Sequence, residues 1–135
     1  MSFAEFSADL QIGHDEIDRQ HASLFEAINN LYDAMRSNRS RQIQAETLAF
    51  LNLYTVEHFM TEETLMRNKG YSGLVAHEAM HEDLVEQLKE LEKNYAAGTM
   101  TLSIMTMHFL KDWLTDHIRT VDARFFDFLK QNEQS

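Results

Sequence analysis

The chain has 135 residues, of which 44% are hydrophobic and 25% charged, as is typical of one globular domain. Twenty-two acidic and twelve basic residues leave a formal charge of -10, which disfavours binding to nucleic-acid phosphates and to anionic lipid surfaces. The absence of cysteine excludes disulfides, iron-sulfur clusters and thiolate zinc sites, so any metal ion must be held by nitrogen and oxygen.

The chain begins with an arm of about 14 residues that opens MSFAEFSADL. This start lacks the basic-then-apolar order of a signal peptide, and no apolar run in the sequence reaches the roughly 18 to 20 residues of a membrane span. We therefore expect a cytoplasmic protein without membrane insertion. Its arm is expected to pack Phe3, Phe6 and Leu10 across the rest of the domain.

Two amphipathic helices are predicted after the arm. Apolar residues at three- and four-residue spacing predict the first over residues 17–35, and Asp15 or Asp18 is expected to cap its start. The same spacing predicts a second helix that ends near Asn68, where the sequence KGYSG indicates a turn.

Two further helices are predicted over residues 74–95 and 110–129. The absence of proline allows all four to run long. Because short connections favour antiparallel neighbours, the sequence predicts an all-α fold: an antiparallel up-down-up-down four-helix bundle over residues 15–131 with an N-terminal arm, residues 1–14. We expect residues 1–135 to form a single domain and a monomer.

Each apolar stripe is interrupted by side chains that can ligate a metal ion. Five imidazoles and two carboxylates of this kind are distributed over the four helices: His21, His58, Glu62, His77, His81, His117 and Asp122. Ligands four residues apart lie one turn apart on the same helix face. Burying all these groups without partners would cost more than the ~5 to 15 kcal/mol by which a small domain is stable, whereas metal cations would satisfy them. The sequence therefore predicts a metal site on the bundle axis.

The size of this ligand set indicates two metal ions. Seven protein ligands exceed the six positions of one octahedral ion, and two carboxylates are suited to bridging two ions. With Glu62, Asp122 and a solvent-derived oxo or hydroxo group as bridges, three histidines saturate one ion, and two leave the other ion with one vacant position. Imidazole and carboxylate also accept zinc or manganese, so the residue types alone leave the metal open.

The spacing between His117 and Asp122 departs from that of a regular α-helix. Five residues correspond to about 140° of rotation between the two side chains, so one of them would point away from the shared centre. We therefore predict a π-bulge or local unwinding at this place in the fourth helix.

Four motifs occur in order along the chain: IDRQH, HFMTEE, GYSGLVAHEAMH and WLTDHIRTVD. With them the chain resembles the hemerythrins, in particular the single-domain bacterial members, over nearly its whole length. The resemblance implies two iron ions bridged by an oxo or hydroxo group, Glu62 and Asp122. It also implies which histidines hold each ion, with His77, His81 and His117 on the saturated iron and His21 and His58 on the open iron.

The resemblance implies that dioxygen binds reversibly at the open iron. The protein would then be a carrier or store that supplies an oxygen-consuming enzyme, and not itself an enzyme. The neighbouring Trp113, Leu114 and Ile118 are expected to line an apolar ligand pocket. Two alternatives remain open, namely an oxygen or redox sensor and a di-iron enzyme that acts on peroxide or nitric oxide.

Three other signals are interpreted as unrelated to the centre. HEAMH matches the zinc-protease motif H-E-x-x-H, but that assignment would leave five of the seven ligands without a role and places Glu78 toward solvent. His108 lies about half a helix revolution from His117 and is expected to face elsewhere. His14 precedes the first helix and is expected to be exposed.

Overall fold

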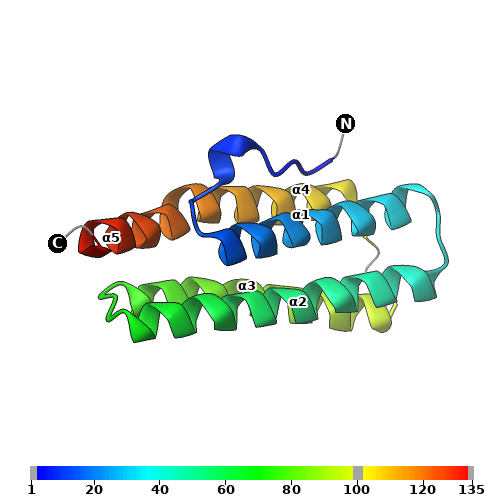
Figure 1. The fold of residues 1–135 in the computed structure, drawn as a ribbon. Coiled ribbons are helices and arrows are strands. Elements are labelled where there is room, and N and C mark those ends of the chain that lie inside the picture. Colours follow the sequence, from blue (N-terminus) through cyan, green and yellow to red (C-terminus); the bar gives the residue numbers. More distant parts are fainter. Residues whose placement is uncertain (1–2, 99–101, 134–135) are drawn as a thin grey trace.

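The computed structural model of the chain describes residues 3–98 and 102–133, and every regular element in these ranges is a helix. The helices form four rods, which run alternately in opposite directions (Figure 1). The first three are α1 (Asp15–Arg36), α2 (Arg41–Asn68) and α3 (Leu74–Ala96). The fourth rod consists of α4 (Ile104–Asp116), a π-helix (His117–Asp122) and α5 (Ala123–Glu133).

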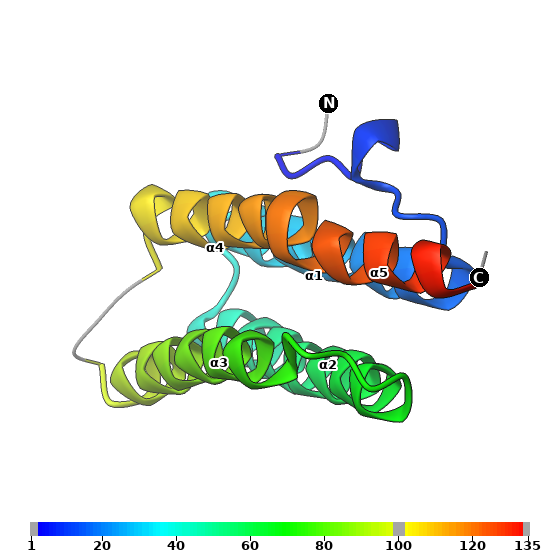
Figure 2. The same cartoon turned by 90° about the vertical axis from the view of Figure 1, so that its left-hand side faces the viewer.

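The rods form two layers, with α1 beside the fourth rod in one layer and α2 beside α3 in the other (Figures 1 and 2). The predicted all-α, up-down-up-down four-helix bundle is therefore confirmed. No helix in the described ranges is both long and apolar enough to cross a membrane.

Side chains cap the starts of α1, α2 and α4, although the residue predicted to cap α1 is wrong. His14 is the N-cap of α1, and its Nδ1 accepts a hydrogen bond from the Ile17 N–H at 3.3 Å. Asp15 is instead the first helical residue, and the Asp18 carboxylate accepts the N–H groups of residues 12 and 13 at 2.9 and 3.1 Å. An Asp near a helix start can bind the preceding chain as well as its own helix, and the arm provides those donors.

The arm packs on α1 as predicted. The Phe3 ring stacks on Tyr32 with centroids 4.1 Å apart. The Asn29 side chain accepts the N–H of Ala4 at 2.7 Å and donates to its carbonyl at 2.8 Å. Leu10 ends a short 3₁₀-helix (Ala8–Leu10) and is buried. These contacts hold the arm over the outside of α1 and α4 (Figure 1).

Two apolar clusters divide the interior along the bundle axis. The larger cluster includes Leu24 of α1 and Leu84 of α3, and the smaller one, at the α5 end, includes Ile17, Met66 and Phe125. On α1, His21 lies between Ile17 of the smaller cluster and Leu24 of the larger one. The buried polar residues of the other rods lie close to His21, at the same height along the bundle axis. The fold therefore places one polar layer between two apolar ones, shielded from water along the axis.

Candidate metal centre

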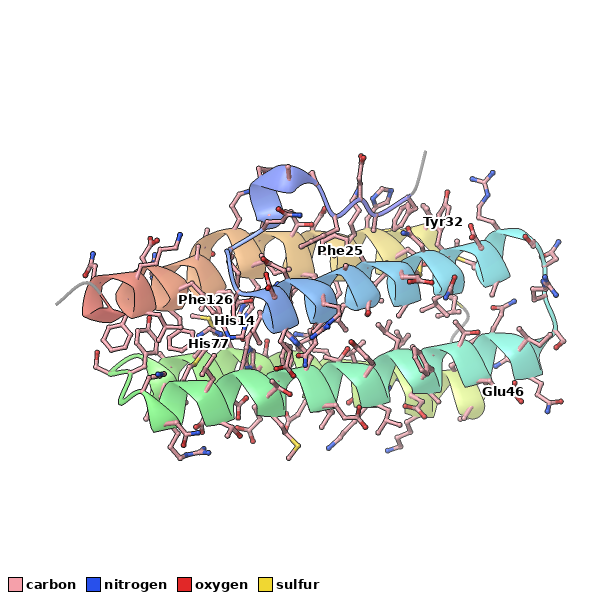
Figure 3. The ribbon with its side chains drawn as sticks, viewed as in Figure 1. His14, Phe25, Tyr32, Glu46, His77 and Phe126 are labelled. Carbon is pink, nitrogen blue, oxygen red and sulfur yellow. The ribbon has the colours of Figure 1, made fainter. Side chains whose placement is uncertain are left out.

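The structure brings all seven predicted side chains into this polar layer. They come from all four rods, and each is buried, with no more than 5% of its surface exposed: His21, His58, Glu62, His77, His81, His117 and Asp122. Figure 3 shows His77 between the two layers of helices. Charged groups and imidazoles are rarely buried this completely without partners. The charges and lone pairs of this layer must therefore be compensated within the layer itself.

Three of the imidazoles form one group around two carboxylate oxygens. The Asp122 Oδ1 atom lies 2.8 Å from the His77 Nε2 atom and 3.2 Å from that of His117. The Glu62 Oε1 atom lies 3.3 Å from the His77 Nε2 and 3.4 Å from the His81 Nε2. The ligating atoms of these five residues all lie within 4.8 Å of one another.

The other two imidazoles form a second group around the remaining carboxylate oxygens. The Nε2 atoms of His21 and His58 lie 3.2 and 3.0 Å from the Glu62 Oε2. The His21 Nε2 also lies 3.2 Å from the Asp122 Oδ2. Glu62 and Asp122 therefore each direct one oxygen toward the group of three histidines and the other toward the group of two.

The π-helix aligns the last two members of the set. Its hydrogen bonds connect residues five apart, so His117 and Asp122 come to lie over one another instead of about 140° apart. The predicted departure from regular helix is confirmed at the six residues His117–Asp122. The irregularity allows both side chains to face the same centre.

The donor set fits two metal cations. The Glu62 Oε1 and the Asp122 Oδ2 are buried without a hydrogen-bond partner among the described residues. Imidazole nitrogens also face each other, with the His117 Nε2 3.0 Å from that of His81 and 3.2 Å from that of His77. Lone pairs that converge in this way repel one another unless protons or cations lie between them. Two overlapping groups of nitrogen and oxygen ligands suit two ions that prefer those atoms, iron among them.

The electrostatics of the metal-free groups show the same compensation. Burial lowers the pKa of His21 and of His77, but hydrogen bonds to Asp122 and Glu62 outweigh it and raise both pKa values to about 9. Burial raises the pKa of Glu62 and of Asp122, but hydrogen bonds from the surrounding histidines lower both well below their ordinary values. Two imidazolium charges thus balance two carboxylates, and cations would replace the two protons.

Four residues that support the centre were not predicted from the sequence. Phe59 stacks on His81 with centroids 3.6 Å apart and ring planes within 1°. The His81 Nδ1 donates to the Glu63 Oε2 at 2.8 Å, and the His58 Nδ1 donates to the Gln20 Oε1 at 2.7 Å. Gln20 and Glu63 are sequence neighbours of predicted ligands, which is the one signal that could have identified them.

The fourth residue, Asn29, anchors the arm over α1. Its two hydrogen bonds to Ala4 hold the segment that carries Phe6, whose ring lies 6.5 Å from that of His21. An asparagine on a predicted amphipathic helix is usually interpreted as solvent-facing, so the sequence contained no signal for this contact.

An apolar cavity of about 20 Å³, which is room for about one water-sized molecule, is lined in part by Phe59, the ring that stacks on His81. Eight apolar residues and one threonine line it: Leu24, Ile28, Leu51, Thr55, Phe59, Leu84, Leu88, Leu110 and Leu114. The Thr55 hydroxyl already donates to the Leu51 carbonyl at 2.7 Å, so the wall has no free hydroxyl donor. Such a cavity favours small apolar molecules over water.

Of the three residues predicted to line a ligand pocket, Leu114 lines this cavity. Trp113 instead stacks on His117 with centroids 4.5 Å apart, and the fully buried Ile118 borders a groove beneath the arm.

The histidines and the glutamate that were predicted to be unrelated lie outside the centre. His108 is exposed, and its ring centroid lies 5.2 Å from that of Phe3. Glu78 accepts a hydrogen bond from Arg67 at 3.3 Å near the surface, away from the position that a zinc-protease base would need. His14 is half-buried, contrary to the prediction that it is exposed, because it caps α1.

Comparisons with known proteins point to one family. Residues 12–129 match the family described as "Hemerythrin HHE cation binding domain". The bacteriohemerythrin of Methylococcus capsulatus is 35% identical over 90% of this chain and 89% of its own length. The myohemerythrin of Riftia pachyptila is 31% identical over 85% of this chain and 84% of its own. A solved structure of wild-type hemerythrin is similar with a TM-score of 0.89 and 32% identity, covering 93% of this chain and 97% of that one.

Proposed function

The chain belongs to the hemerythrin family, and from this membership we propose that it binds dioxygen reversibly at a pair of iron ions, as an oxygen carrier or store. The arrangement of the two carboxylates carries the proposal. Glu62 and Asp122 each direct one oxygen toward the group of three histidines and the other toward the group of two, at 2.8 to 3.3 Å from the nearest imidazole nitrogens. This is the disposition that two bridging ligands require.

The ligand roles follow from the two groups. His77, His81 and His117 would hold one iron ion, His21 and His58 the other, and both carboxylates would bridge the pair. With both carboxylates and a solvent-derived oxo or hydroxo group shared by the pair, three imidazoles would complete six-coordination at one ion, and two imidazoles would leave one position free at the other. Dioxygen would bind at that position.

Two iron ions, when bound, supply the electrons that dioxygen takes up and recover them when it leaves. The protein's own contribution is to exclude water and to orient the ligands. Phe59 lines the apolar cavity, and its ring centroid lies 5.9 Å from that of His58, so it connects the route of an apolar ligand with the ion that would keep a free position. A dry approach also limits the entry of protons and anions, which favours reversible release.

The composition of the cavity wall favours carriage over catalysis. Reduction of peroxide or nitric oxide requires a proton donor close to the vacant position. Among the residues that line the cavity, Thr55 has the sole hydroxyl, and it is already engaged with a backbone carbonyl. The wall therefore suits binding and release of an apolar molecule, which the protein would deliver to an oxygen-consuming enzyme.

Anaerobic reconstitution with ferrous iron tests this function. We expect two iron ions per chain and a visible absorption band that appears when oxygen is admitted and disappears when it is removed. His77→Ala combined with Glu62→Ala should abolish both results, whereas His108→Ala, a substitution of an exposed histidine outside the centre, should leave them unchanged. Failure of the unmodified chain to retain two ions, or permanent oxidation at the first exposure, would contradict the proposal.

A further inference from the structure

Two of the five histidines in the centre have a side-chain partner on the nitrogen that faces away from it, and the two partners differ in charge. The His81 Nδ1 donates to the carboxylate of Glu63 at 2.8 Å. The His58 Nδ1 donates to the amide oxygen of Gln20 at 2.7 Å. The carboxylate therefore lies behind the group of three histidines and the neutral amide behind the group of two.

Both contacts set the tautomer of the ring. A carboxylate can only accept, so the proton of neutral His81 lies on Nδ1 and the Nε2 lone pair points into the centre. The Gln20 Oε1 has the same effect on His58. Each partner thus prepares one imidazole to bind a cation.

The charge of the partner distinguishes the two groups further. A carboxylate that accepts the Nδ1 proton raises the basicity of the imidazole and strengthens its bond to a metal ion, and an amide does so much less. Phe59 stacked on the His81 ring holds that ring in the plane that Glu63 requires. Glu63 itself is 22% exposed, at the edge of a groove of about 330 Å³ between α2 and α3.

We propose that Glu63 and Gln20 are positioning residues that make the two metal positions unequal. The position of His77, His81 and His117 binds iron more tightly and fills first, and the position of His21 and His58 fills second and is vacated first. The inference rests on the proposed di-iron function of the same site. It adds an order of loading, and it attributes part of the difference to two residues that do not themselves ligate the metal.

Charge exchange at these two positions separates the role of charge from that of geometry. Glu63→Gln keeps an oxygen that accepts the His81 proton but removes the charge, and Gln20→Glu adds a charge behind His58 with the same acceptor. Glu82→Gln is the matched control, because Glu82 borders the same groove as an exposed carboxylate and is not one of the partners of the ligand histidines described above. Thermal unfolding of the iron-loaded proteins verifies that each variant is folded.

The test is a challenge of the anaerobic, ferrous-loaded full chain with increasing concentrations of a ferrous chelator, counting the iron that remains bound. The unmodified protein should lose its two ions in two separate steps. Glu63→Gln should shift the second, more resistant step to roughly 10- to 100-fold lower chelator, and Gln20→Glu should shift the first step to higher chelator. Glu82→Gln should shift neither.

The possible outcomes are distinguishable. If the unmodified chain retains fewer than two ions before the challenge, the proposed function itself fails. If it retains two but Glu63→Gln behaves like Glu82→Gln, or shifts the first step instead of the second, the inference is overturned and the proposed function stands.

Discussion

Raising the pH from 6.5 to 9 is expected to strengthen metal binding at the centre. The pKa values of His21 and His77 are raised to about 9, so at pH 7 each imidazole carries a proton that a metal ion must displace. One pKa unit corresponds to ~1.4 kcal/mol, and about two units separate pH 7 from each pKa, so each proton weakens binding by about 100-fold at that pH. Because the two histidines belong to different groups, the affinity of each metal position should rise by roughly 10-fold per pH unit and level off above pH 9.

Titration of the metal-free chain with chelator-buffered zinc at several pH values measures this slope, since imidazole and carboxylate ligands also accept zinc. Parallel measurements in weakly buffered solution should detect about one proton released per ion at pH 7.5. Affinity that is constant between pH 6.5 and 9, or binding without proton release, would refute the assigned protonation of His21 and His77.

The stability of the metal-free fold should respond with the opposite sign. A histidine whose pKa is higher in the folded than in the unfolded state stabilises the fold fully below pH 6.5, and this contribution is lost as the pH rises to about 9. The loss is on the order of 3 kcal/mol per histidine. Glu62 and Asp122 have lowered pKa values, so their contribution is present above about pH 4.5 and lost as the pH falls. Urea unfolding should therefore show greatest stability between about pH 4.5 and 6.5; an unchanged midpoint from pH 6.5 to 9 is the contrary result.

Three substitutions test other parts of the structure. Phe59→Ala removes a buried ring that stacks on His81 and should lower the free energy of unfolding by about 3 to 5 kcal/mol in urea titrations; a loss below 1 kcal/mol would mean that the ring is not part of the packed core. Asn29→Ala leaves the N–H and carbonyl of Ala4 without partners, so it should cost about 1 to 3 kcal/mol and make the arm more sensitive to limited proteolysis, and an unchanged cleavage rate would count against the anchor. Leu110→Phe fills the 20 Å³ cavity and should slow dioxygen uptake in stopped-flow absorption without altering iron content; uptake at the original rate would show that dioxygen enters elsewhere.

The features that were predicted correctly from the sequence are those that depend on position along one helix. The apolar stripes, the four rods and the faces that carry the seven candidate ligands all follow from angular spacing, which residue numbers determine. The π-helix at His117–Asp122 belongs to the same class, because five residues on a regular helix cannot place both side chains on one face.

The features that were missed depend on how the helices are rotated and shifted relative to each other. Gln20 of α1 supports His58 of α2, and Glu63 of α2 supports His81 of α3, so each contact crosses between rods. Periodicity shows that a side chain leaves its helix near the centre, but it does not show which neighbouring ring that side chain meets. The cap of α1 was missed for a related reason, because Asp18 binds the preceding arm and leaves the cap position to His14.

The apolar pocket shows the same division between sequence and structure. Trp113, Leu114 and Ile118 lie within six residues of one another beside His117, and their hydrophobicity alone made them equivalent candidates. The packing of α1, α2 and α3 leaves its gap opposite Leu114, while it stacks Trp113 on His117 and turns Ile118 toward the arm. The sequence by itself determined the helices and the kinds of ligand they present. The tertiary structure alone decided which oxygen faces which histidines and where the cavity lies, because these depend on distances between helices that no pattern within one helix contains.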